Sequence, residues 1–343
     1  MISQRKPKIN NIIFSRACCC IGIVVFHYFC HSKGKFKFLY STANSDFGFM
    51  FVTSFFCISG FVLYYNYPLT LTIKKFYYKR WKSILVPYYI TFIYFFFIES
   101  FLLKKVIFFG NWKMFLFNII GLDGFFSYRF KTNYLVGEWF LGAIIIIYLL
   151  FPIILFLTNK ISIFINIIFL CIIYFLMYKG KNFFIISQQR NIITCIASLF
   201  FGMEAFKFKH YILDNNLSII ISSFLLILLC SIKIDINFKL LIFQLQGFCL
   251  FIFLYKIGYY AMQTKIHFIF EEISNLSYNI FLFHHKLIIY IFSIHKPEKW
   301  YANILFLLLS IIIIIICSKI HLMVVNRISK SYIFKKLDKL FIS

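Results

Sequence analysis

A chain of 343 residues is long enough for two soluble domains, but its composition excludes that class of protein. Hydrophobic residues make up 62% of the sequence, charged residues only 14%, and the mean hydropathy is +0.86. The formal net charge of +25 would suggest a nucleic-acid partner in a soluble domain. Here the 36 Lys and Arg lie almost entirely in short segments between apolar runs, which is typical of membrane topology and of contact with lipid headgroups. We therefore expect an integral membrane protein with no nucleic-acid partner.

The first apolar run, Ile12 to Cys30, follows a basic start that contains Arg5, Lys6 and Lys8. No small-residue cleavage site follows the run, so we expect a retained first span instead of a signal peptide. The ten Cys of the chain form no CxxC pair and fall mostly inside apolar runs. This placement indicates small buried residues, not disulfides or a metal site.

Cutting the chain wherever charged or turn residues cluster leaves about ten apolar stretches close to the ~20 residues that cross a bilayer. The predicted spans are residues 12–31, 47–67, 84–103, 135–157, 161–178, 191–206, 217–232, 239–260, 273–294 and 301–322. Residues 112–121 are too few to cross and are expected to lie along the interface or to re-enter. The predicted fold class is all-α. We expect one membrane domain over residues 1–343, embedded over about 12–322, with a basic cytoplasmic tail at 323–343.

An even number of spans places both termini on one side of the membrane. Charge favours the cytoplasm for that side, because Lys and Arg concentrate in cytoplasmic loops. Two segments carry most of this bias: the basic tail 327–339 and the run between the second and third spans, which contains Lys74, Lys75, Lys79, Arg80 and Lys82.

Ionisable groups in hydrocarbon are costly unless they are paired or face a wet cavity, so they are the first candidates for function. Arg16 and His27 in the first span are eleven residues apart, which leaves them within about 20° of one helix face and about 16 Å apart along the axis. This face suits a long ligand with an anionic end near Arg16 and a reactive end near His27. The alternative is that Arg16 extends to the interface while His27 bonds to a neighbouring helix. His27 and His31 lack a third ligand nearby, so we expect no metal site.

In the ninth span, Ser277 and His284 lie seven residues apart on one face, and Tyr278 and His285 repeat that spacing one position on. Two adjacent histidines cannot both point into one cavity. We expect His284 to face inward and His285 to pack or lie at the interface. Glu99, Glu138, Glu204 and Lys286 are further ionisable residues in or at the ends of the predicted spans.

Several common chemistries are excluded because their motifs are absent. The chain contains no GxxxxGK[ST], GxGxxG, GxSxG or HExxH motif. It also lacks the HxxxxD spacing of one class of peripheral acyltransferases and the DxD pair of many glycosyltransferases. Proton transfer by histidine inside the membrane remains.

Four segments of the chain form a recognisable set: RACCCIGIVVFH at 16–27, FFCISGFVL at 55–63, KRWKSILVPYY at 79–89 and ISNLSYNIFLFHH at 273–285. Taken together, they resemble the acyltransferase 3 family of membrane O-acyltransferases. WFLGAIIIIYLLFP at 139–152 and FFGMEA at 200–205 are weaker matches. The sequence departs from the family's pattern at Ser83, where a second Arg is common, and at Ile144, where many members have Glu. Ser59 and Gly60 of the second segment are expected to allow close helix packing.

The resemblance implies transfer of an acyl group, most often acetyl, from acyl-CoA to a hydroxyl of a cell-surface or exported glycan. It also implies a multi-pass protein of the bacterial plasma or inner membrane. Acyl-CoA, here acetyl-CoA, is then a donor co-substrate, and no permanently bound cofactor is expected. The chain would be a membrane-only version of the family, with no attached hydrolase-like domain.

The resemblance also suggests roles for individual residues. Under this hypothesis Arg16, with the basic run, binds the phosphates of CoA, and His27 is the general base. Candidates for holding the acceptor or stabilising the oxyanion are His284, Tyr278 and Ser277. The residues of the basic run assigned to CoA are Arg80, Lys79 and Lys82.

Three alternatives remain at this stage. A transporter of a glycan or lipid-linked intermediate would also have ten spans, although it should show an internal repeat and Gly or Pro breaks in paired spans. A membrane O-acyltransferase of the unrelated histidine-containing type would lack the pair of Arg16 and His27 in the first span. A structural protein would need no buried ionisable groups.

Overall fold

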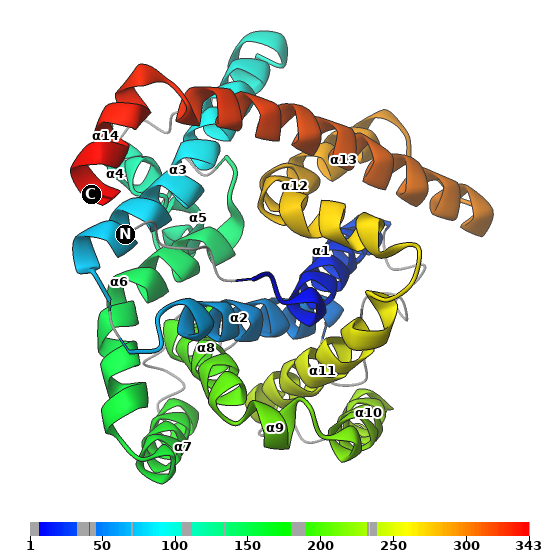
Figure 1. The fold of residues 1–343 in the computed structure, drawn as a ribbon. Helices are drawn as coiled ribbons and strands as arrows, with labels where there is room; N and C mark the ends of the chain where they lie inside the picture. The colour runs from blue at the N-terminus through cyan, green and yellow to red at the C-terminus, as the bar shows by residue number, and fades with distance from the viewer. Residues whose placement is uncertain are drawn as a thin grey trace. The chain divides into compact units, whose positions relative to one another are not determined.

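The protein is helical throughout its described parts (Figure 1). The computed structural model describes residues 7–32, 41, 46–69, 71–104, 112–132, 135–179, 190–231, 233 and 239–342. Within these ranges there is no strand, only an isolated bridge between Ser41 and Asp46. The all-α fold predicted from the apolar runs is confirmed.

Within the described residues, ten helices of at least sixteen residues follow the ten predicted spans in order. They are α1 (Asn10–His31), α2 (Phe47–Asn66), α3 (Ile73–Phe97), α6 (Glu138–Lys160), α7 (Ile163–Lys179), α8 (Ile192–Lys207), α10 (Asn216–Ser231), α11 (Lys239–Ala261), α12 (His267–Ile294) and α13 (Trp300–Ser329). In the part of the chain that the structure describes, six segments are long and apolar enough to cross a membrane: Asn10–His31, Phe47–Asn66, Ile73–Leu102, Trp139–Lys160, Leu241–Ala261 and Trp300–Ser329. The membrane character is thereby supported, while the count of ten spans and the side of the termini stay predictions.

Short helices fill the connections. A π-helical turn, η2 (Ile98–Leu102), extends α3, and a 3-10 turn, η3 (Trp112–Met114), leads into α4 (Phe115–Ile119) and α5 (Asp123–Phe126). The other two are α9 (Lys209–Ile212) and the C-terminal α14 (Tyr332–Ile342). By contacts the chain divides into two compact units. Unit 1 comprises Met1–Leu69 and Ile153–Ser277, and unit 2 comprises Thr70–Pro152 and Tyr278–Ser343.

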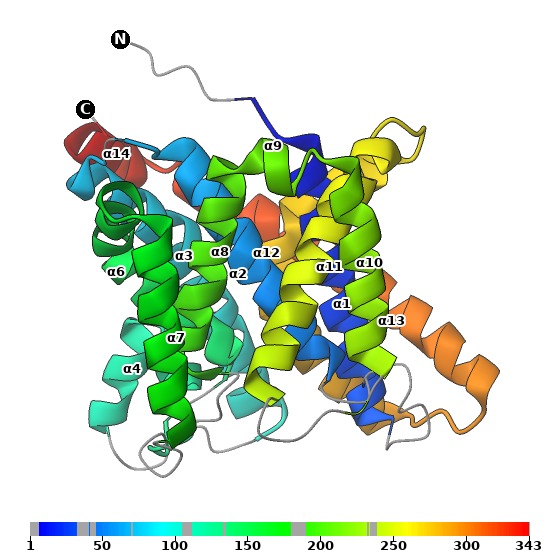
Figure 2. The ribbon, with the colours of Figure 1, turned by 90° about the horizontal axis from the view of Figure 1, so that it is seen from below.

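Unit 1 is built around α1, α2, α8 and α11, and α10 packs on the outside of α11. In Figure 2, α2, α8 and α11 run side by side. Glycines make this closeness possible. A Cβ atom on Gly60 would lie 1.9 Å from the carbonyl oxygen of Leu199, and one on Gly202 would lie 1.9 Å from that of Cys57. Since backbones approach this closely only at small residues, the packing role expected for Gly60 is confirmed.

Unit 2 packs α3 against the first part of α6, the second part of α12 and α13. Its apolar core contains Tyr88, Phe92 and Phe95 of α3 with Leu282 and Phe283 of α12. The segment 112–132 does not form a span. It makes short turns and packs against this core, because Gly121 lies beside Leu85 and Ile145, and Gly142 lies beside Phe125. The prediction that residues 112–121 do not cross is confirmed.

Replacing Gly60 or Gly202 by Ala should lower the stability of the protein. The added methyl group meets a backbone oxygen and not a flexible side chain, so α2 and α8 must move apart. Overpacking of this kind costs about 1–3 kcal/mol. Thermal unfolding in detergent micelles measures the effect, and Ser59→Ala, next to Gly60, is the matched control. Unchanged midpoints for both glycine variants would contradict the packing argument.

Candidate active site

Arg16 and His27 lie on one face of α1, as the sequence predicts. The helix is unbroken from Asn10 to His31, so the separation of about 16 Å along its axis holds in the fold. Both side chains are half-buried, whereas neighbouring residues such as Ser15, Ala17 and Tyr28 are buried. The two side chains that carry the proposed chemistry are therefore not fully enclosed within the described residues.

The face that bears Arg16 and His27 is turned toward α12 within unit 1. Cys20 lies within about 40° of both residues on the helical wheel. Its thiol donates to the carbonyl oxygen of Ser277 at 3.8 Å. One end of the two helices is also in contact, since the rings of Phe14 and Phe270 lie 4.7 Å apart edge to face. The structure thus brings the α1 face to the segment that begins the ISNLSYNIFLFHH motif.

Ser277 and Tyr278 have their hydroxyl protons engaged. Ser277 donates to the carbonyl of Ser274 at 2.8 Å within α12. Tyr278 donates to the carbonyl of Ile84 on α3 at 2.9 Å. Each hydroxyl has one proton, so neither is placed to donate to an oxyanion in this arrangement. The observed task of Tyr278 is to hold α12 on α3.

His284 is buried and His285 is half-buried, in agreement with the expected difference between them. The Nδ1 atom of His284 lies 2.8 Å from the carbonyl oxygen of Phe281 and 3.2 Å from that of Ile280. Both partners only accept, so we assign the proton of the neutral ring to Nδ1 and the lone pair to Nε2. The ring thereby has a fixed tautomer with its basic nitrogen directed away from its own helix backbone.

The basic run at the start of α3 does not act as one cluster. Lys82 forms an ion pair with Asp338 of α14 at 2.8 Å. Arg80, about 200° away on the helix, lies over the rings of Phe76 and Tyr148 at 5.5 and 5.4 Å. Lys79 is exposed. The contact with α14 places the run and the basic tail at the same end of unit 2, as their common assignment to one side of the membrane requires.

A buried ion pair joins α3 and α12. Lys286 Nζ lies 2.7 Å from Glu99 Oε1, and the Tyr290 hydroxyl donates to the same oxygen at 3.0 Å. Only 9% of the Glu99 side chain is exposed. Glu99 lies in the π-helical turn η2, a distortion that often marks functional positions. The sequence pointed to both charged residues but not to their pairing.

Asp123 is a buried carboxylate that the sequence did not single out. Tyr88 donates to its Oδ1 at 2.9 Å and Asn118 to its Oδ2 at 3.0 Å, while Thr132 bonds its backbone carbonyl. These bonds fix the short helices α4 and α5 to α3. Burial raises the pKa of the Asp123 carboxyl to about 7, against the lowering effect of the Tyr88 and backbone hydrogen bonds.

His321 forms a second buried polar connection, between three helices. Its Nδ1 atom lies 2.6 Å from Asn279 Oδ1 on α12, and its Nε2 atom lies 3.0 Å from Thr91 Oγ1 on α3. All three side chains are buried. A lone histidine near the end of an apolar helix gave no motif, so its partners came only from the fold.

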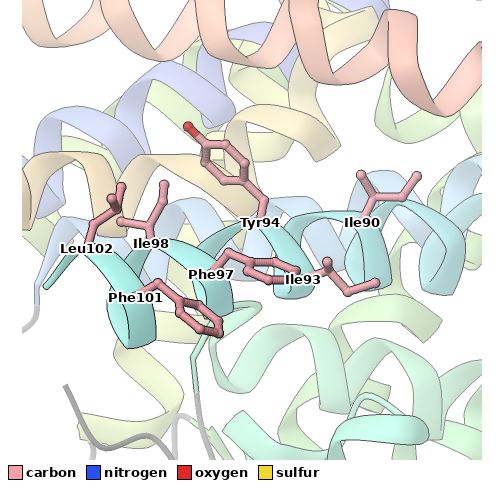
Figure 3. A pocket seen from close by; sticks show the side chains of 7 residues that line it. All are labelled: Ile90, Ile93, Tyr94, Phe97, Ile98, Phe101 and Leu102. Atoms are coloured by element: carbon pink, nitrogen blue, oxygen red, sulfur yellow. The ribbon is translucent and has the colours of Figure 1, made fainter. Parts of the chain in front are cut away.

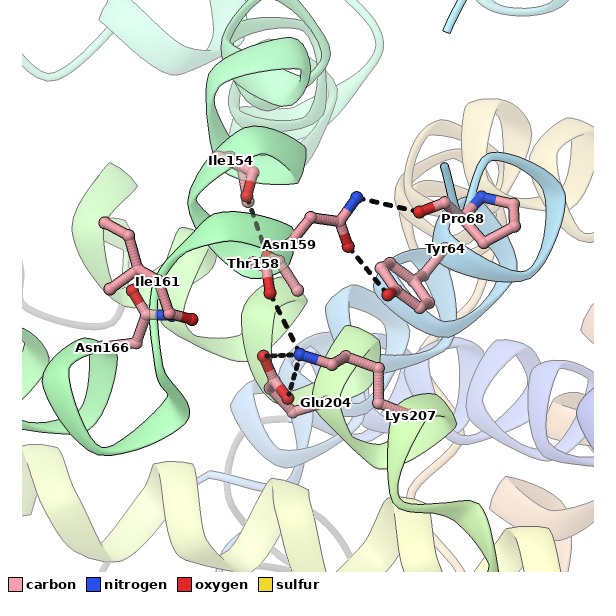
Figure 4. A network of polar contacts seen from close by, with 9 residues as sticks. All are labelled: Tyr64, Pro68, Ile154, Thr158, Asn159, Ile161, Asn166, Glu204 and Lys207. Atoms are coloured by element: carbon pink, nitrogen blue, oxygen red, sulfur yellow. Dashed lines mark hydrogen bonds and ion pairs between the residues drawn. The ribbon is translucent and has the colours of Figure 1, made fainter. Parts of the chain in front are cut away.

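Glu204 belongs to a network at one end of unit 1 (Figure 4). Lys207 pairs with Glu204 at 3.4 Å and donates to the carbonyl of Thr158 at 3.0 Å. Asn159 accepts from the Tyr64 hydroxyl at 2.9 Å and donates to Pro68. The network ties α2, α6 and α8 together, which accounts for Glu204 by structure without catalysis. The Glu138 side chain lies outside the described residues.

An open hollow on α3 is apolar and contains none of these residues (Figure 3). Its lining residues are Ile90, Ile93, Tyr94, Phe97, Ile98, Phe101 and Leu102. Its lining can hold hydrocarbon, and Tyr94 is the one lining residue with an ionisable side chain. Among the described ranges, no three His, Cys, Asp or Glu side chains gather as metal ligands would.

The sequence pattern of the acyltransferase domain that defines the acyltransferase 3 family matches residues 9–322. The chain belongs to the acyltransferase 3 family. This acyltransferase is therefore a membrane enzyme, and the match extends from just before α1 to within α13. The chain matches no curated protein and no solved structure.

The contribution of Asp123 to the stability of the acyltransferase should fall as pH rises from about 4 to about 7. An Asp carboxyl in the unfolded chain is ionised above its ordinary pKa of 3.8, while folded Asp123 keeps its proton up to about 7. Between these values the folded state binds the extra proton, so the free energy of unfolding drops by at most about 1.4 kcal/mol per pH unit.

Thermal midpoints of the wild type, Asp123→Asn and Glu298→Gln between pH 4 and 8 measure this dependence. Glu298 is an exposed carboxylate between α12 and α13. Compared with the wild type, Asp123→Asn should remove a fall in stability with rising pH from the slope, whereas Glu298→Gln should leave the slope unchanged. The slopes of the midpoints against pH are compared, and not the midpoints themselves, because Asp123→Asn also changes hydrogen bonds. Equal slopes for all three proteins would refute the assignment.

Breaking the ion pair of Glu99 and Lys286 from one side should destabilise unit 2 strongly. Glu99→Gln or Lys286→Met alone leaves the other charge buried, at a cost of about 3–5 kcal/mol. The double variant removes both charges and should recover most of the loss. Thermal unfolding of the four proteins gives the coupling directly. Additive losses in the double variant would show that the two groups do not depend on each other.

Proposed function

We propose that this acyltransferase moves an acetyl group from acetyl-CoA to a hydroxyl of a cell-surface or exported glycan, in the bacterial inner membrane. The observation that carries the proposal is the α1 face with Arg16 and His27, about 16 Å apart and turned toward Ser277 of α12. A cation and an imidazole at this spacing suit a donor with an anionic head and a reactive far end.

Arg16 is proposed to bind the anionic part of the donor. A guanidinium stays charged in a partly buried position and offers paired donors that match phosphate oxygens. The pantetheine arm of CoA is long enough to extend from Arg16 along α1 to His27. For the start of α3, the expectation that Arg80, Lys79 and Lys82 bind CoA phosphates stays part of the proposal for unit 2.

His27 is proposed as the general base. Its imidazole takes the proton of the acceptor hydroxyl while the hydroxyl oxygen attacks the thioester carbonyl. The resulting tetrahedral intermediate collapses with cleavage of the C–S bond, and the leaving CoA thiolate takes the proton from His27. The products are the acetyl ester and CoA thiol, and His27 returns to its neutral form. A base held in place contributes about 10²–10⁴-fold to the rate.

His284 is proposed to hold the acceptor. Its tautomer presents Nε2 as an acceptor, which suits a sugar hydroxyl but not an oxyanion. The hydroxyl protons of Ser277 and Tyr278 are donated to backbone carbonyls, so these two residues are proposed to hold the acceptor through their hydroxyl oxygens, which can still accept.

His27→Ala should abolish acylation while leaving the protein folded. In cells with the gene deleted, O-acyl signals in NMR or mass spectra of surface polysaccharide should vanish, and the wild-type gene should restore them. His27→Ala should not restore them at matched membrane levels. His31→Ala, one turn along α1, is the matched control and should restore them. Full restoration by His27→Ala would remove His27 from the chemistry.

Arg16 should affect donor binding more than turnover. Arg16→Ala should raise the KM for acetyl-CoA by about 10–100-fold, the equivalent of a lost charge-assisted hydrogen bond. Arg16→Lys should recover part of the loss because it keeps the charge without the fork. Purified protein with acetyl-CoA and released CoA thiol as the readout measures both constants.

If no strain in the cell experiment shows a change in surface acylation, a small-molecule acceptor or the transporter alternative replaces the glycan acceptor.

A further inference from the structure

The C-terminal helix α14 covers the basic start of α3 (Figure 1). Both segments belong to unit 2. The face of α14 toward α3 carries Phe334, Asp338 and Phe341, whereas Lys336 and Leu340 on the other side are exposed. α14 is therefore an amphipathic helix seated on the segment that bears the basic run, not a loose tail.

Asp338 of α14 is the anion that binds Lys82 of α3. Lys82 Nζ lies 2.8 Å from both carboxylate oxygens, and the Tyr78 hydroxyl donates to Oδ1 at 2.7 Å. A carboxylate bound by an ammonium group and a hydroxyl occupies the position that a phosphate oxygen would take. Burial, which raises the pKa of Asp338, is outweighed by the hydrogen bonds and charge of Lys82 and Tyr78, so its pKa is lowered and it is ionised at neutral pH.

Aromatic contacts on both sides of Asp338 seat the helix. Phe341 stacks on Tyr78 with ring centroids 4.9 Å apart, and Phe334 stacks on Trp81 with ring centroids 6.0 Å apart. Two further lysines of the run are used: Lys74 lies over the Phe341 ring, and Lys75 donates to the carbonyl of Ile342 at 2.8 Å. Three of the five cations between the second and third predicted spans are thus engaged by α14.

This seating is weak enough to be reversed. The side chains of Lys82 and Asp338 are 21% and 36% exposed, and ion pairs at that exposure contribute little because water screens them. A phosphate carries more charge and more acceptor oxygens than one carboxylate, so it competes well for Lys82. Nothing but non-covalent contact holds α14 on α3.

We propose that α14 is a displaceable cap whose Asp338 carboxylate competes with the phosphates of CoA for Lys82 and Tyr78. The inference rests on the proposed use of acyl-CoA and adds regulation of that site. With the cap seated, the binding-competent fraction is reduced, and the apparent affinity for the donor falls by the same factor. Ligand binding and cap release are then linked, since each favours the other.

The affinity of the purified full-length protein for CoA tests the cap. Asp338→Asn keeps the size of the side chain, removes the competing charge and should tighten CoA binding about three- to tenfold, the factor set by the capped fraction. Leu340→Lys adds the same unit of charge on the exposed side of α14 and should change the affinity less than twofold. Equal effects of the two variants, or no tightening in Asp338→Asn, would overturn the proposal.

Amide hydrogen exchange of residues 332–342 provides a readout without turnover. Asp338→Asn should exchange faster than the wild type, and inorganic pyrophosphate should accelerate exchange in the wild type but not further in the variant. If no protein binds CoA, the donor in the proposed function is wrong. The effect of pyrophosphate on the wild type then tests the cap by itself. Faster exchange of residues 332–342 supports the cap, and unchanged exchange contradicts it.

Discussion

Polar groups on spanning helices have no water to bond, and the rest of the structure depends on this constraint. Several buried charges and amides are paired with a side chain or a carbonyl of another helix. Glu99, in the turn η2 that extends α3, forms an ion pair with Lys286 on α12. His321 on α13 is hydrogen-bonded to Asn279 on α12. Gln244 on α11 donates to the carbonyl of Thr194 and the hydroxyl of Ser198 on α8. Because an unpaired partner would be costly in hydrocarbon, these bonds determine which faces of the helices meet.

The same constraint leaves a rigid frame for the proposed chemistry. In unit 1, backbones meet at Gly60 and Gly202, so α2 and α8 cannot slide without a clash. α1 packs on α2 and on α11, which holds Arg16 and His27 at a constant separation. Proximity contributes to catalysis only when the reacting groups are already in position. A base on a packed helix satisfies this condition better than one on a loop would.

The basic run on α3 shows how one short segment serves two physical ends. Its positive charge is expected to act as a topology signal when the chain inserts. In the folded protein Arg80 and Lys82 have different neighbours. Arg80 rests on the rings of Phe76 and Tyr148, while Lys82 turns to Asp338. Residues two positions apart on a helix point in nearly opposite directions, so a run of like charges seldom forms one site. The C-terminal helix α14 contacts the side of α3 on which Lys82 lies.

The sequence by itself determined the ten long helices, their order and the common face of Arg16 and His27. These properties are local: they follow from the apolar length of each run and from the helical repeat of 3.6 residues, which hold whatever the neighbours are. Only the tertiary structure decided the partners. Cys20 and Ser277 are 257 positions apart, Lys82 and Asp338 are 256 apart, and Glu99 and Lys286 are 187 apart. Spacing along one helix says which residues share a face, but which helix lies opposite depends on the packing of the whole chain, because hydrocarbon-facing and helix-facing apolar residues look alike in the sequence.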